Sequence, residues 1–168
     1  MGELISDMWE TLYGARGCGL AAPQIGKAIR LFLVDSKTTY ESFNEEDREN
    51  YFESTDTGIV ETFINAKIIS RSEDDWDDEE GCLSIPNMTQ SVNRSWRINI
   101  EYLDSEFNQH TKTFAGATAR MIQHEYDHTE GILYFDYLSP LVKKRIEGKL
   151  KKISKGLLPA RYPMSYVK

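Results

Sequence analysis

The sequence predicts an α+β protein forming a single domain over residues 1–168, with small mixed or antiparallel sheets packed around a central helix and a further helix at the C-terminus. Three observations favour this class. The length of 168 residues suits one domain with a sizeable core. Strand-like runs outnumber helical ones and do not alternate with them in a βαβ order. The sequence contains no internal repeat and no linker rich in Pro, Gly or Ser.

The first half of the chain begins with apolar residues at helical spacing from Leu4 to Tyr13, which predict a helix. Residues 16–26, RGCGLAAPQIG, hold three glycines and a proline and predict a structured loop. RLFLV at 30–34 is typical of a short buried strand. The polar, acidic segment 38–58 is expected to be a surface excursion with at most one or two helical turns.

The second half is expected to contribute most of the strands. Residues 59–64 read as one strand, and 95–103 and 109–114 as a pair separated by a turn-like segment. A helix is predicted at 116–128, where residues recur at helical intervals. A last helix is predicted at 140–154, with proline in its first turn.

The charge distribution argues against a specific nucleic-acid binder, because the net charge is −7. Two local exceptions stand out. Residues 143–155 hold seven basic residues and one acidic residue, and seven of the eight residues at 73–80 are acidic. The basic segment can be a docking surface, but we favour a solvated helix face.

The cysteines and the apolar pattern indicate the compartment. Cys18 and Cys82 are the two cysteines, and their wide separation fits free thiols in a reducing environment better than a disulfide framework. No apolar run approaches the roughly 20 residues of a membrane span. The first ten residues also lack the features of a secretory signal. We therefore expect a cytoplasmic protein with no membrane partner.

The segment MIQHEYDH, residues 121–128, predicts a metal site. On a helix His124 and His128 lie one turn apart on one face, so two imidazoles can hold one metal ion. Glu125 is rotated by about 100° from His124. It is too far round to ligate easily but near enough to take a proton from a water molecule at the metal. The alternative is a chance occurrence of this short motif.

A catalytic metal site needs a third protein ligand. Candidates are Cys82, His110 and many carboxylates. Cys82 is favoured because a thiolate binds borderline-soft metals strongly and because the neighbouring Gly81 lets the backbone approach closely. Cys18 competes, and one of the two cysteines is expected to be an ordinary small buried residue.

Three segments together resemble the signature motifs of peptide deformylases: GCGLAAPQ at 17–24, EGCLS at 80–84 and QHEYDH at 123–128. The similarity continues through YFDYLSPL at 134–141 into the last predicted helix, so it covers nearly the whole chain. The resemblance is to the bacterial iron-type enzymes. It implies a metal-dependent hydrolase that removes the N-formyl group from the formylmethionine of newly made polypeptides and releases formate.

The resemblance also implies the roles of individual residues. The metal ligands would be Cys82, His124 and His128, with Glu125 as general acid and base. The Gln24 side chain and the Leu83 backbone N–H would donate to the formyl oxygen. The Gly19 backbone would lie along the bound peptide. Candidates for the wall of the methionine slot are Cys18 and Met121, although core packing explains Met121 equally well.

The same resemblance implies a structural role for Glu80 and Arg94, as a buried ion pair that steadies the Cys82 loop. Asp127 is expected either to orient a ligating imidazole or to lie on a solvent face. The acidic residues before Glu80 depart from the family and are interpreted as a solvated loop near the mouth of the site. The family also usually has an extended segment before the first helix, and a missing strand there would expose a sheet edge.

The implied cofactor is iron(II), with zinc, nickel or cobalt as possible occupants of the purified protein. The implied partners are N-formylmethionyl nascent peptides and, through the basic helix at 143–155, the ribosome, in a bacterial cytoplasm. Two other classes compete. A metallopeptidase that cleaves internal bonds would take a third ligand downstream, from Glu130, Asp136 or Glu147. A non-catalytic relative would bind metal without needing Glu125 and Gln24.

Overall fold

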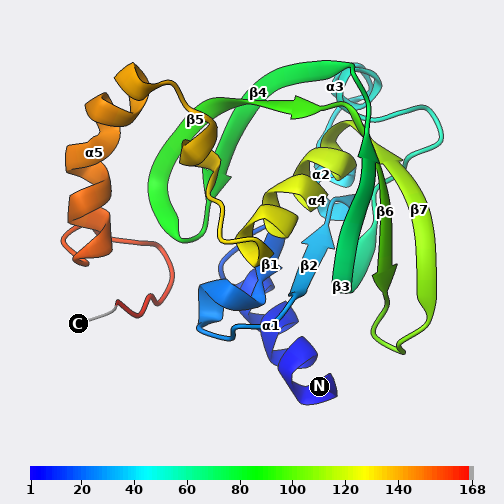
Figure 1. Cartoon of the computed structure of the whole chain (residues 1–168), viewed down its shortest axis with the longest axis horizontal. Coiled ribbons are helices and arrows are strands. Elements are labelled where there is room, and N and C mark those ends of the chain that lie inside the picture. The colour runs from blue at the N-terminus through cyan, green and yellow to red at the C-terminus, as the bar shows by residue number, and fades with distance from the viewer. Residues whose placement is uncertain (167–168) are drawn as a thin grey trace.

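The structure, a computed structural model that describes residues 1–166, is built from two antiparallel sheets with one helix between them (Figure 1). The larger sheet has the strand order β1-β2-β3-β6-β7, and the smaller one is the β4–β5 hairpin. The strands are β1 Gly19–Ala21, β2 Leu31–Asp35, β3 Val60–Arg71, β4 Asp75–Cys82, β5 Ile85–Ser95, β6 Arg97–Leu103 and β7 Gln109–Ala115. The predicted α+β class is confirmed.

The helices lie around these sheets. They are α1 Gly2–Gly14, α2 Lys37–Ser42, α3 Glu45–Tyr51, α4 Gly116–Thr129 and α5 Pro140–Ser154, with short 3-10 helices η1 at Ala22–Ile25 and η2 at Tyr134–Tyr137. The first, the central and the last helix were all predicted from sequence. Within residues 1–166, none of the helices is long and apolar enough to cross a membrane.

Alternation along β2 builds two apolar layers, one on each face of the large sheet. Phe32 and Val34 face α4, whose Ala119 and Ile122 belong to the same core cluster. Leu31 and Leu33 face the opposite side and pack with residues of α1. Because successive side chains of a strand point to opposite faces, the run LFLV suits a strand that is covered on both sides.

The central helix begins at a position that only glycine suits. Gly116 has a φ of 55°, in the left-handed region that glycine adopts without steric cost. A Cβ atom at this position would lie 3.2 Å from the carbonyl carbon of Tyr51. The chain therefore turns sharply out of β7 and sends α4 between the two sheets.

The acidic segment is a strand and not the solvated loop expected from sequence. Residues 75–82 form β4, which pairs with β5 from Asp75↔Ser95 to Gly81↔Thr89. Exposed and partly or fully buried residues alternate along it, so only half of its side chains face solvent. The segment 38–58 likewise holds two short helices, more than the expected one or two turns, and the 16–26 loop contains β1 and η1.

Candidate active site and metal centre

Three potential metal ligands converge where the end of β4 meets the last turns of α4. One ligand atom from each of Cys82, His124 and His128 lies within 4.8 Å of the others, and Cys82 Sγ is 3.3 Å from His128 Nε2. The helix places the two imidazoles one turn apart, and β4 delivers the thiol from a segment over 40 residues earlier. A thiolate and two imidazoles suit a divalent transition metal.

The other candidate ligands lie elsewhere. His110 stands on β7 and its Nε2 pairs with Asp104 at 2.7 Å. The downstream carboxylates that a metallopeptidase would use have other partners: Glu130 pairs with Arg30, Asp136 accepts from the Leu133 N–H, and Glu147 pairs with Lys151. Within residues 1–166 the converging set is the cysteine and histidine set alone.

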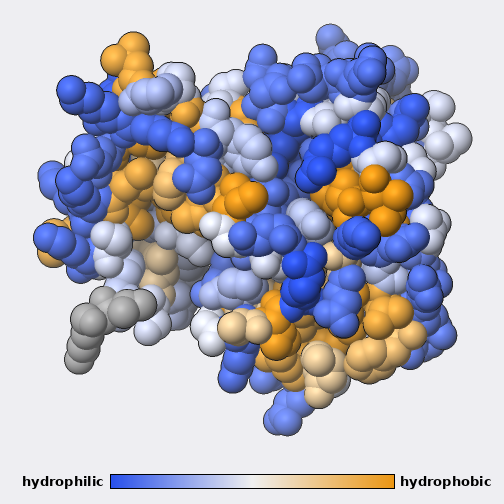
Figure 2. All heavy atoms as spheres, in the orientation of Figure 1, coloured by the Kyte–Doolittle hydropathy of each residue, from blue (hydrophilic) through white to orange (hydrophobic). Residues whose placement is uncertain are grey.

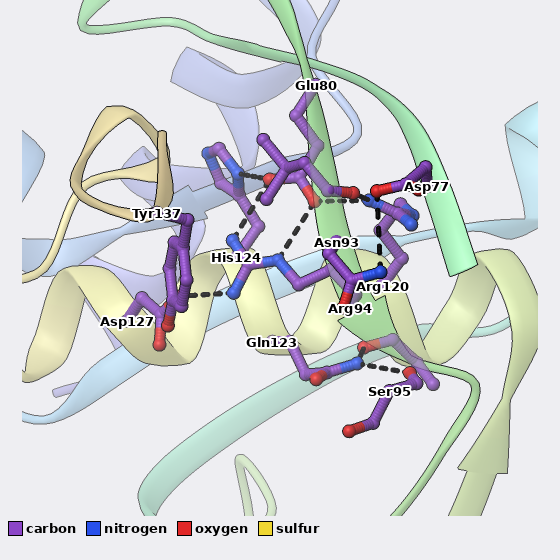
Figure 3. Close-up of polar contacts among 12 residues, drawn as sticks. Asp77, Glu80, Asn93, Arg94, Ser95, Arg120, Gln123, His124, Asp127 and Tyr137 are labelled. Atoms are coloured by element: carbon purple, nitrogen blue, oxygen red, sulfur yellow. Dashed lines mark hydrogen bonds and ion pairs between the residues drawn. The ribbon is translucent and has the colours of Figure 1, made fainter. Parts of the chain in front are cut away.

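Glu80 fixes the orientation of the first histidine (Figure 3). Its Oε2 lies 2.9 Å from His124 Nδ1, so Nδ1 carries the proton that is donated and Nε2 remains for a metal. Burial alone would raise the pKa of Glu80, but hydrogen bonds from His124 and Arg94 outweigh burial and lower it to about 2. Glu80 is therefore a carboxylate over the whole physiological pH range.

Two arginines complete the surroundings of Glu80. Arg94 donates to both of its oxygens, at 2.9 and 3.0 Å, and Arg120 donates to Oε1 at 2.7 Å. Arg94 also pairs with Asp127, which accepts a further hydrogen bond from Tyr137 at 2.8 Å. The predicted ion pair between Glu80 and Arg94 is present, and it is buried. Asp127 neither orients an imidazole nor lies on a solvent face, because it is a buried partner of Arg94.

Glu125 is a buried carboxyl group whose pKa lies near neutrality. Burial raises this pKa to about 7, against the charge of His124, which lowers it. Its Oε2 is buried with no hydrogen-bond partner among residues 1–166. Across from it, a Cβ atom at Gly19 would lie 2.6 Å from Glu125 Cγ and 2.7 Å from Cδ. The absence of a side chain at Gly19 is what leaves room for the carboxyl group.

Gln24 is held with its amide nitrogen toward the ligand loop. Its Oε1 accepts from the Ala21 N–H at 2.8 Å, which fixes which end of the amide faces the site. Its Nε2 lies 3.1 Å from Ser84 Oγ and 3.5 Å from Cys82 Sγ. The loop segment 16–26 therefore presents a hydrogen-bond donor beside Cys82 and Ser84, from a region far away in sequence.

Cys82, His124 and Glu125 border one cavity of about 680 Å³. Cys18 and Gly19 line one wall, Leu83 and Cys82 another, and Met121 lies on α4 one turn before Glu125. The cavity thus contains the residues predicted to bind substrate. Cys18 is exposed to the cavity, yet protein surrounds its thiol closely enough to raise the pKa to about 12, with Glu125 adding to the effect of burial.

Sequence reasoning missed several residues of this site. Arg120 donates to Glu80 and to the carbonyl oxygens of Val92 and Trp76, and its guanidinium stacks on the Trp76 ring at 4.2 Å. Tyr162 lines the cavity from the C-terminal segment. A positive charge four residues before His124, on the helix face of the ligands, was the available signal for Arg120. Nothing in the sequence pointed to Tyr162.

A cysteine and two histidines that converge beside a buried carboxyl group, at the wall of an open cavity, define the site of a metal-dependent hydrolase. Comparisons with known proteins specify the class further. The model of the family described as Polypeptide deformylase matches residues 1–144. The chain belongs to this family.

Individual relatives agree with this assignment. A peptide deformylase of Christiangramia forsetii is 43% identical over 164 residues, which cover 98% of this chain and 82% of the relative. One from Flavobacterium johnsoniae is 43% identical over 165 residues with the same coverage. The crystal structure of peptide deformylase from Ehrlichia chaffeensis is similar with a TM-score of 0.77 and 31% identity, over 92% of this chain and 83% of that one.

Proposed function

We propose that Cys82, His124 and His128 hold the catalytic metal ion and that Glu125, Gln24 and the Leu83 backbone act on the reacting formyl group. The activity follows from the family: this metal-dependent hydrolase removes the N-formyl group from the formylmethionine of newly made polypeptides and releases formate. The observation that carries the assignment of roles is the convergence of three ligand atoms within 4.8 Å on the cavity that Glu125 also lines.

The peptide substrate lies along β1 in this proposal. β1 is the edge strand of the large sheet, and the Gly19 backbone borders the cavity. An extended peptide can therefore add to this edge through main-chain hydrogen bonds. The methionine side chain then lies against Cys18 and Met121, which line the same cavity.

Glu125 moves the proton. Cys82, His124 and His128 would hold a metal ion whose Lewis acidity would make a water molecule nucleophilic at neutral pH. Glu125 takes the proton from this water and returns it to the leaving amine, so one carboxyl group serves both steps. A pKa of about 7, which burial produces, suits a group that must both accept and donate a proton near neutral pH.

Gln24 and Leu83 stabilise the charge that develops on the formyl oxygen. The Gln24 amide nitrogen already points toward the ligand loop because its oxygen is held by the Ala21 N–H. The Leu83 N–H follows directly after Cys82 in the chain. Preorganised donors of this kind are worth about 2.7–4 kcal/mol each in the transition state.

The matched variants Gln24→Ala and Gln90→Ala test this role. We expect Gln24→Ala to lower kcat for a formyl-Met peptide by about 10²-fold or more, as removal of one oxyanion donor does. Gln90, whose side chain bonds to the carbonyl of the adjacent Thr89, is the control and should keep full activity. If Gln24→Ala were as active as the native protein at equal metal content, the proposed role would be wrong.

Iron(II) is the ion we propose for the site. The donor set also suits zinc, which often outcompetes iron(II) in affinity; the resemblance to iron-type enzymes supports iron. We expect protein reconstituted anaerobically with iron(II), nickel or cobalt to release formate faster per bound metal than protein loaded with zinc. Equal or greater turnover with zinc would contradict the proposal.

The basic helix α5 supports a proposed contact with the ribosome. Hydrophilic residues follow the outer side of this helix, at the left of Figure 2, while Ile146 and Ile153 pack inward. Lys144 and Lys152 are exposed. Reversing both charges should weaken co-sedimentation with ribosomes and reduce its salt dependence, whereas Lys27→Glu should not. Unchanged co-sedimentation of the charge-reversed variant would contradict the proposed ribosome contact.

We also propose a cytoplasmic location. Newly made polypeptides are the substrate, and Cys18 and Cys82 are free thiols, which fits a reducing compartment. Detection of the tagged protein in a fraction other than the cytoplasm would contradict this location.

A further inference from the structure

The segment that follows α5 returns to the metal-ligand loop. After Ser154 the chain turns at Gly156, whose φ of 66° lies in the left-handed region, and runs back below the β4–β5 hairpin (Figure 1). Leu158 packs against the core cluster of β5, η2 and α5. The Pro159 carbonyl accepts from Asn87 Nδ2 at 2.8 Å. Residues 156–166 are therefore attached to the hairpin at several points.

The closest of these attachments involves the residue that follows Cys82. Tyr162 Oη donates to the Leu83 carbonyl oxygen at 2.7 Å. Burial raises the pKa of Tyr162 above its ordinary value, so the hydroxyl is a donor at neutral pH. Tyr162 also lines the active-site cavity. A hydroxyl on the C-terminal segment thus bonds to the carbonyl of Leu83, the residue whose N–H is expected to bind the formyl oxygen.

The geometry of the peptide groups explains how the Tyr162 hydrogen bond can affect the Leu83 N–H. The Leu83 N–H and the Leu83 C=O belong to successive peptide groups joined at one Cα atom. Fixing the carbonyl direction restricts rotation about that atom and so restricts the direction of the N–H. The Leu83 side chain is anchored on the other side, where its Cδ1 lies against Gly17. The Tyr162 bond supplies the constraint that the side chain does not.

We propose that Tyr162 is a positioning residue for deformylation, which aims the Leu83 N–H at the formyl oxygen through its hydrogen bond to the Leu83 carbonyl. This inference rests on the role proposed above for Leu83. It assigns a function to the segment after α5, which lies beyond the three sequence motifs. Because a misdirected donor weakens mainly the transition state, loss of the hydroxyl should lower kcat more than it changes KM.

Tyr162→Phe removes the hydroxyl and keeps the ring, and Tyr166→Phe is the matched control because its hydroxyl bonds to Met164 Sδ, within the same segment. With a formyl-Met peptide and iron-loaded protein, we expect Tyr162→Phe to lower kcat per bound metal by about tenfold, a fraction of the loss from removing a donor outright. KM should stay within about twofold. Tyr166→Phe should match the native protein. Tyr162→Ala, which also removes the ring from the cavity wall, should raise KM as well.

Two results overturn the inference. One is an unchanged kcat in Tyr162→Phe. The other is a loss that follows metal content, so that kcat per bound metal stays constant; Tyr162 would then only help to retain the ion. Gln24→Ala, measured in parallel, separates the possible failures. If Gln24→Ala loses activity and Tyr162→Phe does not, only the positioning role of Tyr162 is wrong. If both variants stay fully active, the proposed roles of Gln24 and Leu83 as oxyanion donors are wrong as well.

Discussion

The space between Gly19 and Glu125 is too small for one extra carbon atom. The two residues come from β1 and α4, over 100 positions apart in the sequence, and a Cβ atom at Gly19 would lie 2.6 Å from Glu125 Cγ. Atoms in a packed interior do not approach this closely without displacement. The position of the Glu125 carboxyl group therefore depends on the absence of a side chain at Gly19.

We predict that Gly19→Ala displaces the Glu125 carboxyl group and lowers kcat/KM for a formyl-Met peptide by about 10²-fold, the size of effect that misplacement of a catalytic group has. The control is Gly148→Ala, within α5, where an added Cβ meets nothing within 4 Å. That change should keep full activity and raise the stability by up to about 1 kcal/mol. Full activity in Gly19→Ala would show that Glu125 is not held as described.

At the residue scale, local sequence spacing predicted part of the site. The i and i+4 histidines and the adjacent Glu125 were visible because a helix fixes their relative positions. Cys82 could only be favoured over Cys18, since a ligand from another element has no local spacing rule. Arg120 and Tyr162 were missed because their partners, Glu80 and the Leu83 carbonyl, come from distant segments that only the folded chain brings to them.

Among the elements, β4 departs most from the sequence prediction. Asp and Glu are depleted in strands, so seven acidic residues in eight predicted a loop. The strand forms because every second side chain turns inward, where Trp76, Glu80 and Cys82 find partners: Arg120 stacks on Trp76 and bonds to Glu80. The inward-facing acid at Glu80 is stable only because α4 and β5 supply the arginines that neutralise it.

The same strand supports a prediction about metal affinity. Glu80→Gln should weaken metal binding by about 10–100-fold, the usual effect of removing the partner of a ligating histidine, because it removes the carboxylate that accepts from His124 Nδ1. Asp77→Asn, on the exposed side of β4, serves as the control. Competition with a fluorescent chelator measures both affinities, and equal values would contradict the role of Glu80 in orienting His124.

For the whole molecule, the hydrogen bonds of Glu80 with His124, Arg94 and Arg120 make the stability sensitive to acid. The folded-state pKa of Glu80 is lowered to about 2 from an ordinary value of 4.5. A depressed carboxyl pKa contributes stability that is fully present above pH 4.5 and is lost as the pH falls toward 2. The difference between these two pKa values corresponds to about 3 kcal/mol of free energy of unfolding.

Urea unfolding of chelator-treated protein between pH 7 and pH 3 tests this contribution, because the chelator removes any effect of metal release. The native protein should lose more free energy of unfolding across this range than Glu80→Gln, which has no carboxyl group to protonate at this position. Parallel curves for the two proteins would show that Glu80 does not contribute in this way.

The α+β class and the order of most elements could be predicted because hydrophobic periodicity is local. Helices α1, α4 and α5 and the strand β2 lie close to their predicted bounds. Strands β5 and β4 were missed because their pairing partners, and not their own periodicity, determine them. The return of the chain after α5 could not be predicted, since it depends on the turn at Gly156 and on contacts with a hairpin far away in sequence.

Formate release at equal metal content tests the central claim most directly, which is that the Cys82, His124 and His128 site with Glu125 performs the deformylation. Iron-loaded native protein should release formate from a formyl-Met peptide, and it should leave the acetyl-Met analogue intact, because an acetyl group carries a methyl where a formyl group carries only hydrogen. Glu125→Gln with the same iron content should be slower by about 10²-fold or more. Formate release at the native rate by Glu125→Gln would contradict the account.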